Sequence, residues 1–460
     1  MFNVESSMFN VECPRPRALT VRTVCNVMES NYDMAIPLHS RVFFRCHSAW
    51  MGTMLLLAAA VAGGGCSDNF EATPSPWTGH KEAPDEGTTA ISAPTQESPV
   101  ATQPATTTEI AKPIVGTVST PTAGATLAIM HKVADWQLAY PSTDPKNGWI
   151  YAAFYDGVMA LAKLDPNGNY TNAMVEQGKN NRWELGTRAY HADDHAVAQM
   201  YLELYEQTSD PAMMQATRQR FDQIYDYPQS DNLDFSRPDH DNRWSWCDAL
   251  FMDPPAWARL SKVTGEPKYL ASADRRWWVT SDFLYDKDEH LFYRDSTFFK
   301  QLEPNGKKVF WSRGNGWVIA GIARLLDYMP KDYPSRPKYL KQFGEMAEKI
   351  KSLQQDDGLW RTGLLDPASH PQAEESGSGF FAYALAWGIN QGLLDRATYG
   401  PVVFKAWDAM TQCVQLDGKL IHVQPVGAKP EGFPESSHTP YGAGAFLLAG
   451  SEIYKMVGGK

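Results

Sequence analysis

Apolar residues recur at the spacing of an α-helix from about residue 126 to the C-terminus, and this pattern constrains the fold most. Residues 192–207 carry apolar side chains at intervals of 3, 1, 3 and 1, from Val197 to Tyr205. Similar stripes occupy 249–265, 315–328, 338–354, 377–390, 398–415 and 440–456. Gly, Pro and Asp separate these segments, and only short pieces such as 291–293 read as strands that pair within loops. The body is therefore predicted to be all-α.

Aromatic and polar clusters come just before or at the start of these helices, about every 40–70 residues. They are Tyr151–Asp156, Tyr190–His195, Trp244–Asp248, Trp311–Trp317, Glu374–Phe381 and Glu435–Tyr441. This order indicates helical hairpins repeated around a ring, with functional residues at one end. About a dozen helices in 126–460 fit an (α/α)6 barrel, since the repeats of a linear solenoid would resemble one another more closely.

The front of the chain reads as a targeting segment. Residues 1–50 show no sustained period and form a doubtful leader, and 51–66 are an apolar run that ends in small residues and Cys66. The run is too short to span a membrane as a mature helix, and it is typical of a bacterial lipoprotein signal, with a plain secretory signal as the alternative. We expect an exported protein, anchored through lipid on Cys66 and facing the periplasm or the cell surface.

Residues 67–125 are rich in Thr, Pro, Ala, Ser and Glu and lack large apolar side chains. Such a segment buries too little surface to offset its ordering entropy, so it is predicted to be a disordered linker. The catalytic domain is then expected at 126–460.

Charge and cysteine content exclude several kinds of partner. Lys and Arg number 42 against 53 Asp and Glu, a net charge of -11, which argues against nucleic acid. Only Cys247 and Cys413 lie in the body, and no Cys-x-x-Cys pattern occurs. His191 and His195 are spaced i, i+4 but lack a third anchor, so we expect no metal and no cofactor.

Five segments of the body carry a family resemblance. They are Trp246-Cys-Asp248-Ala-Leu-Phe-Met-Asp-Pro-Pro, Trp311-Ser-Arg-Gly-Asn-Gly-Trp317, Asp357-Gly-Leu-Trp-Arg-Thr-Gly-Leu-Leu-Asp366, Glu375-Ser-Gly-Ser-Gly-Phe-Phe381 and Ser437-His-Thr-Pro-Tyr-Gly-Ala-Gly444. In this order they resemble the unsaturated rhamnogalacturonyl and unsaturated glucuronyl hydrolases, glycoside hydrolase family 105. The resemblance covers about 126–456.

The resemblance implies a particular chemistry. Polysaccharide lyases leave a non-reducing-end uronic acid with a double bond between carbons 4 and 5, and these hydrolases add water across that enol ether. Protonation at carbon 4 gives a cation at carbon 5, water adds there, and the hemiketal collapses with release of the aglycone. One carboxyl group must donate a proton and later accept one, unlike the paired carboxylates that flank the anomeric bond in ordinary glycosidases.

Asp248 matches the family's catalytic acid/base in the Trp-x-Asp segment. It also stands between Trp246 and Phe251 at the start of an apolar helix, where partial burial would raise its pKa. A helix N-terminus acts in the opposite direction, because its dipole favours the anion. The alternative is a helix N-cap, a common role for Asp.

The family carries a second acid in the segment that contains Asp193 and Asp194. Adjacent residues on a helix point about 100° apart, so only one of the two is expected to face the cavity. The sequence leaves open which one.

Arg313 and Trp317 match the family's substrate-binding Arg-Gly-x-Gly-Trp pattern. Arg suits a uronate carboxylate because its planar fork is bidentate, and Trp suits stacking on the flattened ring. The alternative is a core Trp317 and a structural ion pair at Arg313. Arg294 stands where several family members carry a His, and a second cation suits a more anionic, sulfated substrate.

Trp246, Trp360 and His438 are the remaining predicted substrate-binding residues. The resemblance implies that they line the cavity. Hairpin structure is the alternative for Trp360, and an exposed His beside a Ser/Thr cap is the alternative for His438.

Two other classes of function fit parts of this pattern. One is another (α/α)-barrel carbohydrate enzyme, either a lyase or an epimerase, and the other is a glycan-binding lipoprotein without activity. The partner is an unsaturated oligosaccharide in the favoured interpretation, with the membrane reached only through the lipid anchor. The parent polysaccharide (pectic, ulvan-type or glycosaminoglycan) and the oligomeric state stay open.

Overall fold

The computed structural model describes residues 120–459. The predicted leader, signal segment, lipid site at Cys66 and most of the linker lie outside these residues. The first helix, α1 (Ala123–Ala139), begins just before the predicted domain boundary at 126, so residues 123–125 are helical and do not belong to the linker. Within the described part, no helix combines the length and hydrophobicity needed to cross a bilayer.

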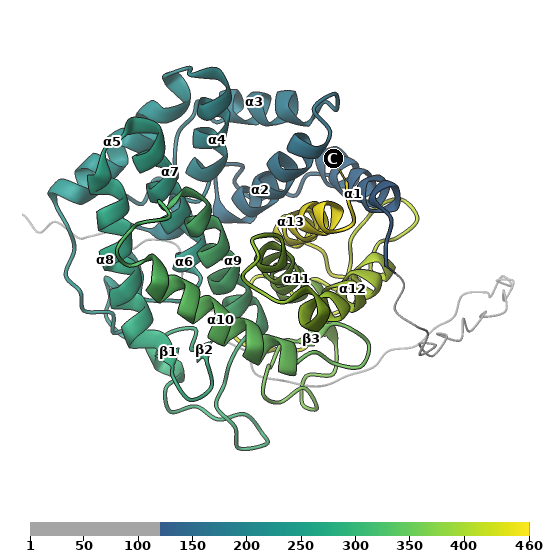
Figure 1. Ribbon diagram of the computed structural model, residues 1–460. Coiled ribbons are helices and arrows are strands. Elements are labelled where there is room, and N and C mark those ends of the chain that lie inside the picture. Colours follow the sequence, from purple (N-terminus) through teal and green to yellow (C-terminus); the bar gives the residue numbers. More distant parts are fainter. Residues whose placement is uncertain (1–119, 460) are drawn as a thin grey trace, which may run out of the picture. The chain divides into compact units, whose positions relative to one another are not determined.

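Inner helices form a closed ring around one axis (Figure 1). They are α2 (Trp149–Leu164), α4 (Ala198–Thr208), α6 (Ala249–Met252) with α7 (Pro254–Thr264), α9 (Ser312–Tyr328), α11 (Glu375–Asn390) and α13 (Pro440–Met456). Each packs against the next, and α13 closes the ring on α2. Most of their side chains are buried, which explains why these segments read as the most apolar of the sequence.

Outer helices cover this ring and alternate with the inner ones along the chain (Figure 1). They are α1, α3 (Tyr170–Asn180), α5 (Ala212–Asp226), α8 (Pro267–Leu284), α10 (Arg336–Ser352) and α12 (Arg396–Gln412). Each outer helix returns the chain to the same end, so the inner helices run parallel and their N-termini meet there. The predicted (α/α)6 barrel is confirmed. The aromatic and polar clusters begin at that end, whereas Asp156 lies in a hollow lined by the C-terminal parts of inner helices, where it pairs with Arg324.

Local structure departs from the helical stripes at two of these N-termini. Residues 192–194 form a short 3₁₀ helix, and α4 begins only at Ala198, so the predicted helix 192–207 starts too early. The predicted helix 249–265 breaks at Asp253, before the two prolines that open α7. The predicted strand piece is confirmed as β2 (Leu291–Phe292), which pairs with β1 (Tyr285–Asp286). A second pair joins β3 (Trp360–Arg361) to β4 (Ala373–Glu374).

Ring closure depends on a close approach of α2 and α13. A Cβ added at Gly444 would stand 2.2 Å from the carbonyl oxygen of Ala153, and one added at Gly157 would stand 2.6 Å from the carbonyl oxygen of Gly444. Only hydrogen fits at both positions, because the two backbones are in direct contact.

We therefore expect Gly444→Ala to separate the two helices and to destabilise the protein by about 1–3 kcal/mol, as overpacked cores do. Gly344→Ala in α10 is the matched control, because a Cβ there meets no atom within 4 Å. Ala should stabilise that helix by roughly 0.5–1 kcal/mol. Thermal melting of both variants checks the prediction. Equal melting temperatures for Gly444→Ala and the wild type would show that the contact between α2 and α13 tolerates a methyl group.

Candidate active site

Asp248 stands at the head of the inner wall, where the chain turns into α6. Its side chain is 11% exposed. It makes no capping hydrogen bond to the helix that it precedes. Asp248 thus occupies the N-cap position of α6, but its carboxyl group does not cap the helix and is available for other chemistry.

Two groups contact the Asp248 carboxyl. Arg294 Nε lies 3.7 Å from Oδ2, and the Cys247 thiol donates a weak hydrogen bond to Oδ1 at 3.5 Å. Burial raises the pKa of Asp248, while the charges of Arg294 and Arg313 and the thiol hydrogen bond oppose that rise. The effect of desolvation is the larger one, so the net pKa of Asp248 is raised and the protonated acid persists to a higher pH than usual.

Asp193 is the second acid of the site. Burial first and the negative charge of Asp248 second raise its pKa to about 7, against the opposing charges of Arg188 and Arg294. His191 Nδ1 lies 3.9 Å from its carboxylate, but burial lowers the pKa of that imidazole to about 4, so the ring is neutral near pH 7. Asp193, Asp248 and Arg294 thus form one electrostatic cluster.

Asp194 has a different partner. Arg188 donates to it from its backbone N–H at 2.7 Å, from Nε at 3.1 Å and from Nη2 at 2.5 Å. Burial alone would raise the pKa of Asp194, but the hydrogen bonds and charge of Arg188 outweigh it and hold that pKa below its usual range. Asp194 is therefore an ionised structural acid that fixes the turn before α4. Of the two acids between which the sequence did not decide, Asp193 is therefore the candidate for the second acid of the site.

Arg294 follows β2, and its guanidinium group is the second cation that the sequence predicted for the substrate site. Its Nη1 donates to Asp295 at 2.8 Å, and its guanidinium lies over the ring of Phe235 at 4.8 Å. The Nε atom that faces Asp248 has no hydrogen-bond partner among the described residues. Arg294 therefore retains a donor on the side of the acid.

Arg313, near the start of α9, is fully buried. Its Nη1 and Nη2 donate to the carbonyl oxygens of Gln424 and Pro425 at 2.7 and 3.0 Å. The rings of Trp311 and Tyr441 lie 4.4 and 4.8 Å from the guanidinium. The guanidinium group predicted to bind a uronate carboxylate is thus hydrogen-bonded to backbone carbonyl groups instead. Arg313 influences Asp248 through its positive charge, which opposes the rise in the pKa of Asp248.

Trp317 and Trp360 do not line the site, contrary to the prediction. Trp317 is 1% exposed, and its ring packs against Phe380 and Phe251 with centroids 4.2 and 4.8 Å apart. Trp360 is fully buried, and its indole donates to the carbonyl of Ile350. Both are packing residues, because their ring faces are already covered.

Trp246 and His438 lie at the same end of the barrel in different surroundings. Trp246 is 4% exposed, and its ring lies 4.9 Å from that of His191, beside Asp193. His438 is exposed and meets the edge of Trp136, with ring centroids 5.4 Å apart. It lines a separate hollow with Tyr140 and Asp144, so the structure groups Trp246 with the acids and leaves His438 apart.

Sequence reasoning missed two buried glutamates at the start of α11. Glu374 accepts from the backbone N–H groups of Ser376 and Gly377, and Gln424 donates to it from the neighbouring loop. Glu375 is fully buried, and neither carboxyl oxygen has a hydrogen-bond partner within residues 120–459. Burial raises the pKa of Glu375 well above its usual range. Glu374 stands two and three residues before Ser376 and Gly377 at the start of a helix. This spacing is a capping signal from which Glu374 could have been identified. Glu375 is the first residue of the family segment Glu375–Phe381, and this is the signal that could have identified it.

Among residues 120–459, no group of three or more His, Cys, Asp or Glu side chains is arranged to hold a metal ion. Cys247 and Cys413 are both free thiols. The available chemistry of the cluster is proton transfer by buried acids next to a fixed cation. The expectation of no metal and no cofactor stays a prediction.

The model of Glycosyl Hydrolase Family 88 matches residues 124–457. A curated relative from Formosa agariphila, named unsaturated 3S-rhamnoglycuronyl hydrolase, is 42% identical over 341 residues, which are 72% of this chain and 90% of that protein. A solved glycosyl hydrolase family 88 structure from Bacteroides vulgatus has a TM-score of 0.66 at 30% identity and covers 73% of this chain and 99% of its own. A structure named polysaccharide lyase has a TM-score of 0.67 at 31% identity and covers 73% and 98%.

The opposite surroundings of Asp193 and Asp194 predict opposite pH effects on stability. The raised pKa of Asp193 means that its contribution is present below pH 4 and is lost as the pH rises towards about 7. The lowered pKa of Asp194 means that its contribution is present above its unfolded pKa and is lost in acid. Asp193→Asn should therefore gain stability relative to the wild type as the pH rises from about 4 to 8. Asp194→Asn should be less stable than the wild type by a constant amount over that range, and this difference should shrink only below about pH 4.

Urea unfolding at about pH 3, 4, 6 and 8 measures both variants against the wild type. Parallel pH profiles for the two variants would show that the acids share one environment, contrary to the geometry.

Proposed function

This chain belongs to Glycosyl Hydrolase Family 88, and from that premise we propose that it acts on oligosaccharides whose terminal unsaturated uronate is linked to a 3-sulfated rhamnose. The family resemblance of the sequence motifs is confirmed. The chain is a glycoside hydrolase of unsaturated uronyl residues. The observation that carries the catalytic proposal is Asp248, a buried acid with a raised pKa that makes no capping hydrogen bond and lies next to Arg294.

The alternative functions fit less well. A lyase is expected to use a Tyr/His pair and an epimerase His acid/bases. The charged groups of the cluster are two acids and an arginine, and its histidine, His191, has its pKa lowered to about 4 by burial. One similar structure is named a lyase, but the curated relative of 42% identity is named a hydrolase. A glycan-binding lipoprotein without activity would have no use for two buried acids whose pKa values are both raised.

Proton delivery starts the proposed reaction. Burial keeps the proton on Asp248, which donates it to carbon 4 of the enol ether. Positive charge then develops at carbon 5, while Asp248 becomes an anion. Arg294 Nε, 3.7 Å from that carboxyl and otherwise unpaired, favours the anion at this moment. Burial of Asp248 thus favours its protonated form before proton transfer, and Arg294 favours its ionised form afterwards.

Water addition completes the reaction. The Asp248 carboxylate takes a proton from a water molecule, whose oxygen adds to carbon 5. This step restores the proton on Asp248. The hemiketal then opens to a ketone at carbon 5 and leaves a hemiacetal at carbon 1, whose hydroxyl proton passes to the glycosidic oxygen as the bond to the next sugar breaks. Asp193 is proposed to hold the reacting groups in place, because its carboxyl lies within the electrostatic reach of both Asp248 and Arg294.

Two observations support a sulfated substrate. The curated relative is named for a 3S-rhamnoglycuronyl substrate, which we interpret as rhamnose with a sulfate on carbon 3, and 90% of that protein aligns. Arg294 supplies a cation where several family members carry His, and cations suit a substrate with an added sulfate.

Asp248→Asn tests the mechanism, because Asn keeps the size of the side chain but carries no transferable proton. We expect turnover to fall by about 10²–10⁴-fold or more, with melting temperature and substrate binding retained. The assay follows loss of the ultraviolet absorbance of the conjugated double bond. Asp194→Asn is the matched control and should retain more turnover at pH 7. A variant at Asp248 that keeps more than roughly a tenth of the wild-type rate would contradict the mechanism.

Matched oligosaccharides test the substrate. Disaccharides of unsaturated uronate linked to rhamnose, with and without the 3-sulfate, should differ in kcat/KM by roughly 10–100-fold in favour of the sulfated form, the range of one charge-assisted hydrogen bond. Unsaturated pectic and glycosaminoglycan digests serve as comparisons. Equal or higher kcat/KM on a desulfated or pectic substrate would reject 3-sulfated rhamnose while leaving the hydrolase activity itself in place.

A further inference from the structure

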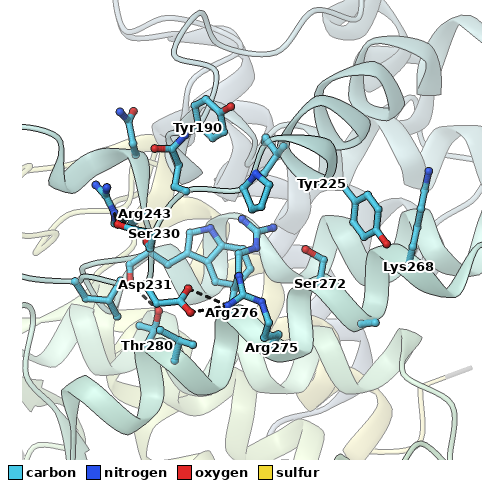
Figure 2. A pocket seen from close by; sticks show the side chains of 18 residues that line it. Tyr190, Tyr225, Ser230, Asp231, Arg243, Lys268, Ser272, Arg275, Arg276 and Thr280 are labelled. Carbon is cyan, nitrogen blue, oxygen red and sulfur yellow. Dashed lines mark hydrogen bonds and ion pairs between the residues drawn. The ribbon is translucent and has the colours of Figure 1, made fainter. Parts of the chain in front are cut away.

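A second cavity opens on the outer wall of the barrel, between α5, α8 and the segment 228–244 (Figure 2). Its volume is about 580 Å³, within the range of roughly 300–1,000 Å³ that small-molecule sites occupy. None of Asp193, Asp248, Arg294 and Arg313 lines it. The cavity is therefore separate from the cluster of acids.

Arg276 is the central charge of this cavity. Its guanidinium is stacked between the rings of Trp244 and Trp257, 3.9 and 4.3 Å from their centroids. The side chain is 18% exposed, and its nearest carboxylate oxygen, on Asp253, is 3.7 Å away. Burial lowers the pKa of Arg276 to about 10, so it stays charged at neutral pH.

Asp253 satisfies Arg276 only in part. Oδ1 and Oδ2 of this buried carboxylate accept hydrogen bonds from the indole N–H groups of Trp257 and Trp244, both at 2.9 Å. His195 Nδ1 lies 3.1 Å from the same Oδ2. Nε and Nη2 of Arg276 have no hydrogen-bond partner among the described residues. Both of these donors are buried, so an anion in the cavity would interact with Arg276 through its incompletely compensated positive charge.

Arg275 provides a second guanidinium beside the first. It is half exposed and is held by both oxygens of Asp231, at 2.8 and 2.9 Å, an ion pair that is drawn in Figure 2. An exposed ion pair of this kind is worth little, so an incoming anion can replace the Asp231 carboxylate. The remaining basic side chains of the wall, Arg243 and Lys268, are committed to Asp239 and Asp222.

Aromatic and hydroxyl groups complete the lining. Tyr225, on α5, is 46% exposed, and Tyr190 donates its hydroxyl hydrogen to the carbonyl of Tyr227 while its ring lines the cavity. Ser272 adds a hydroxyl group from α8. Flat rings offer stacking surfaces for pyranose units, and the paired arginines recognise sulfate or carboxylate.

We propose that this cavity is a second carbohydrate site, which binds a sulfated or carboxylated sugar unit of an oligosaccharide away from the catalytic acids. The anion preference rests on Arg275 and Arg276. The sugar class rests on the proposed function. Such a site would hold longer chains to the enzyme while their ends are processed.

Binding of a saturated sulfated oligosaccharide tests the site, because this ligand has no double bond to hydrate. Titration calorimetry compares it with a neutral oligosaccharide of equal length and with inorganic sulfate. Wild type and Asp248→Asn should bind the sulfated chain equally. Arg275→Ala and Arg276→Lys should each weaken binding by roughly tenfold. In Arg275→Ala, turnover of a short unsaturated disaccharide should stay within about twofold of wild type.

Arg275→Ala is the safer variant, since its side chain is half exposed, and melting curves identify any unfolding of Arg276→Lys. Sulfated-chain binding that falls in Asp248→Asn but not in the arginine variants would place the ligand in the active site and overturn the proposal. Inorganic sulfate that binds as tightly as the oligosaccharide would reduce the cavity to a simple anion site, and equal binding of the neutral chain would remove the role of the arginines. Loss of the proposed function would instead appear in the turnover assay alone.

Discussion

Burial of acidic groups next to a fixed cation is the interaction on which this site depends. Desolvation pushes the proton onto Asp248 and Asp193, and their mutual repulsion strengthens the effect at Asp193. Arg294 pulls in the opposite direction from 3.7 Å. Neither influence alone would serve acid/base chemistry: burial without the cation disfavours the anion that must follow proton transfer, and the cation without burial would ionise the acid at neutral pH.

The ring of helices creates that burial. Six hairpins bring the inner N-termini to one end, so segments far apart in sequence, around 193, 248, 294 and 313, share one site. The ring closes only because α2 and α13 meet backbone to backbone at Gly157 and Gly444. A looser seam would admit water to the axis and reduce the desolvation that raises the pKa values of the acids.

Asp253 connects the inner site to the outer wall. This fully buried carboxylate lies at the break between α6 and α7, accepts from Trp244 and Trp257, and pairs with His195 and Arg276. His195 follows the two acids 193 and 194, whereas Arg276 lines the outer cavity. One anion thus fixes the turn that carries Asp193, the helix that begins after Asp248 and the arginine of the proposed second site.

The sequence by itself determined the helical period, the ring of hairpins, the family and the acid of the Trp-x-Asp motif, because these are encoded in local spacing and residue type. Only the tertiary structure separated Asp193 from Asp194, since the choice depends on which acid meets Arg188. Only the structure showed that Trp317 and Trp360 are core residues and that Arg313 is hydrogen-bonded to backbone carbonyl groups. The outer cavity beside Arg276 was likewise found only in the structure. Burial and pairing are properties of neighbours in space, and a linear pattern names candidates for them without choosing among them.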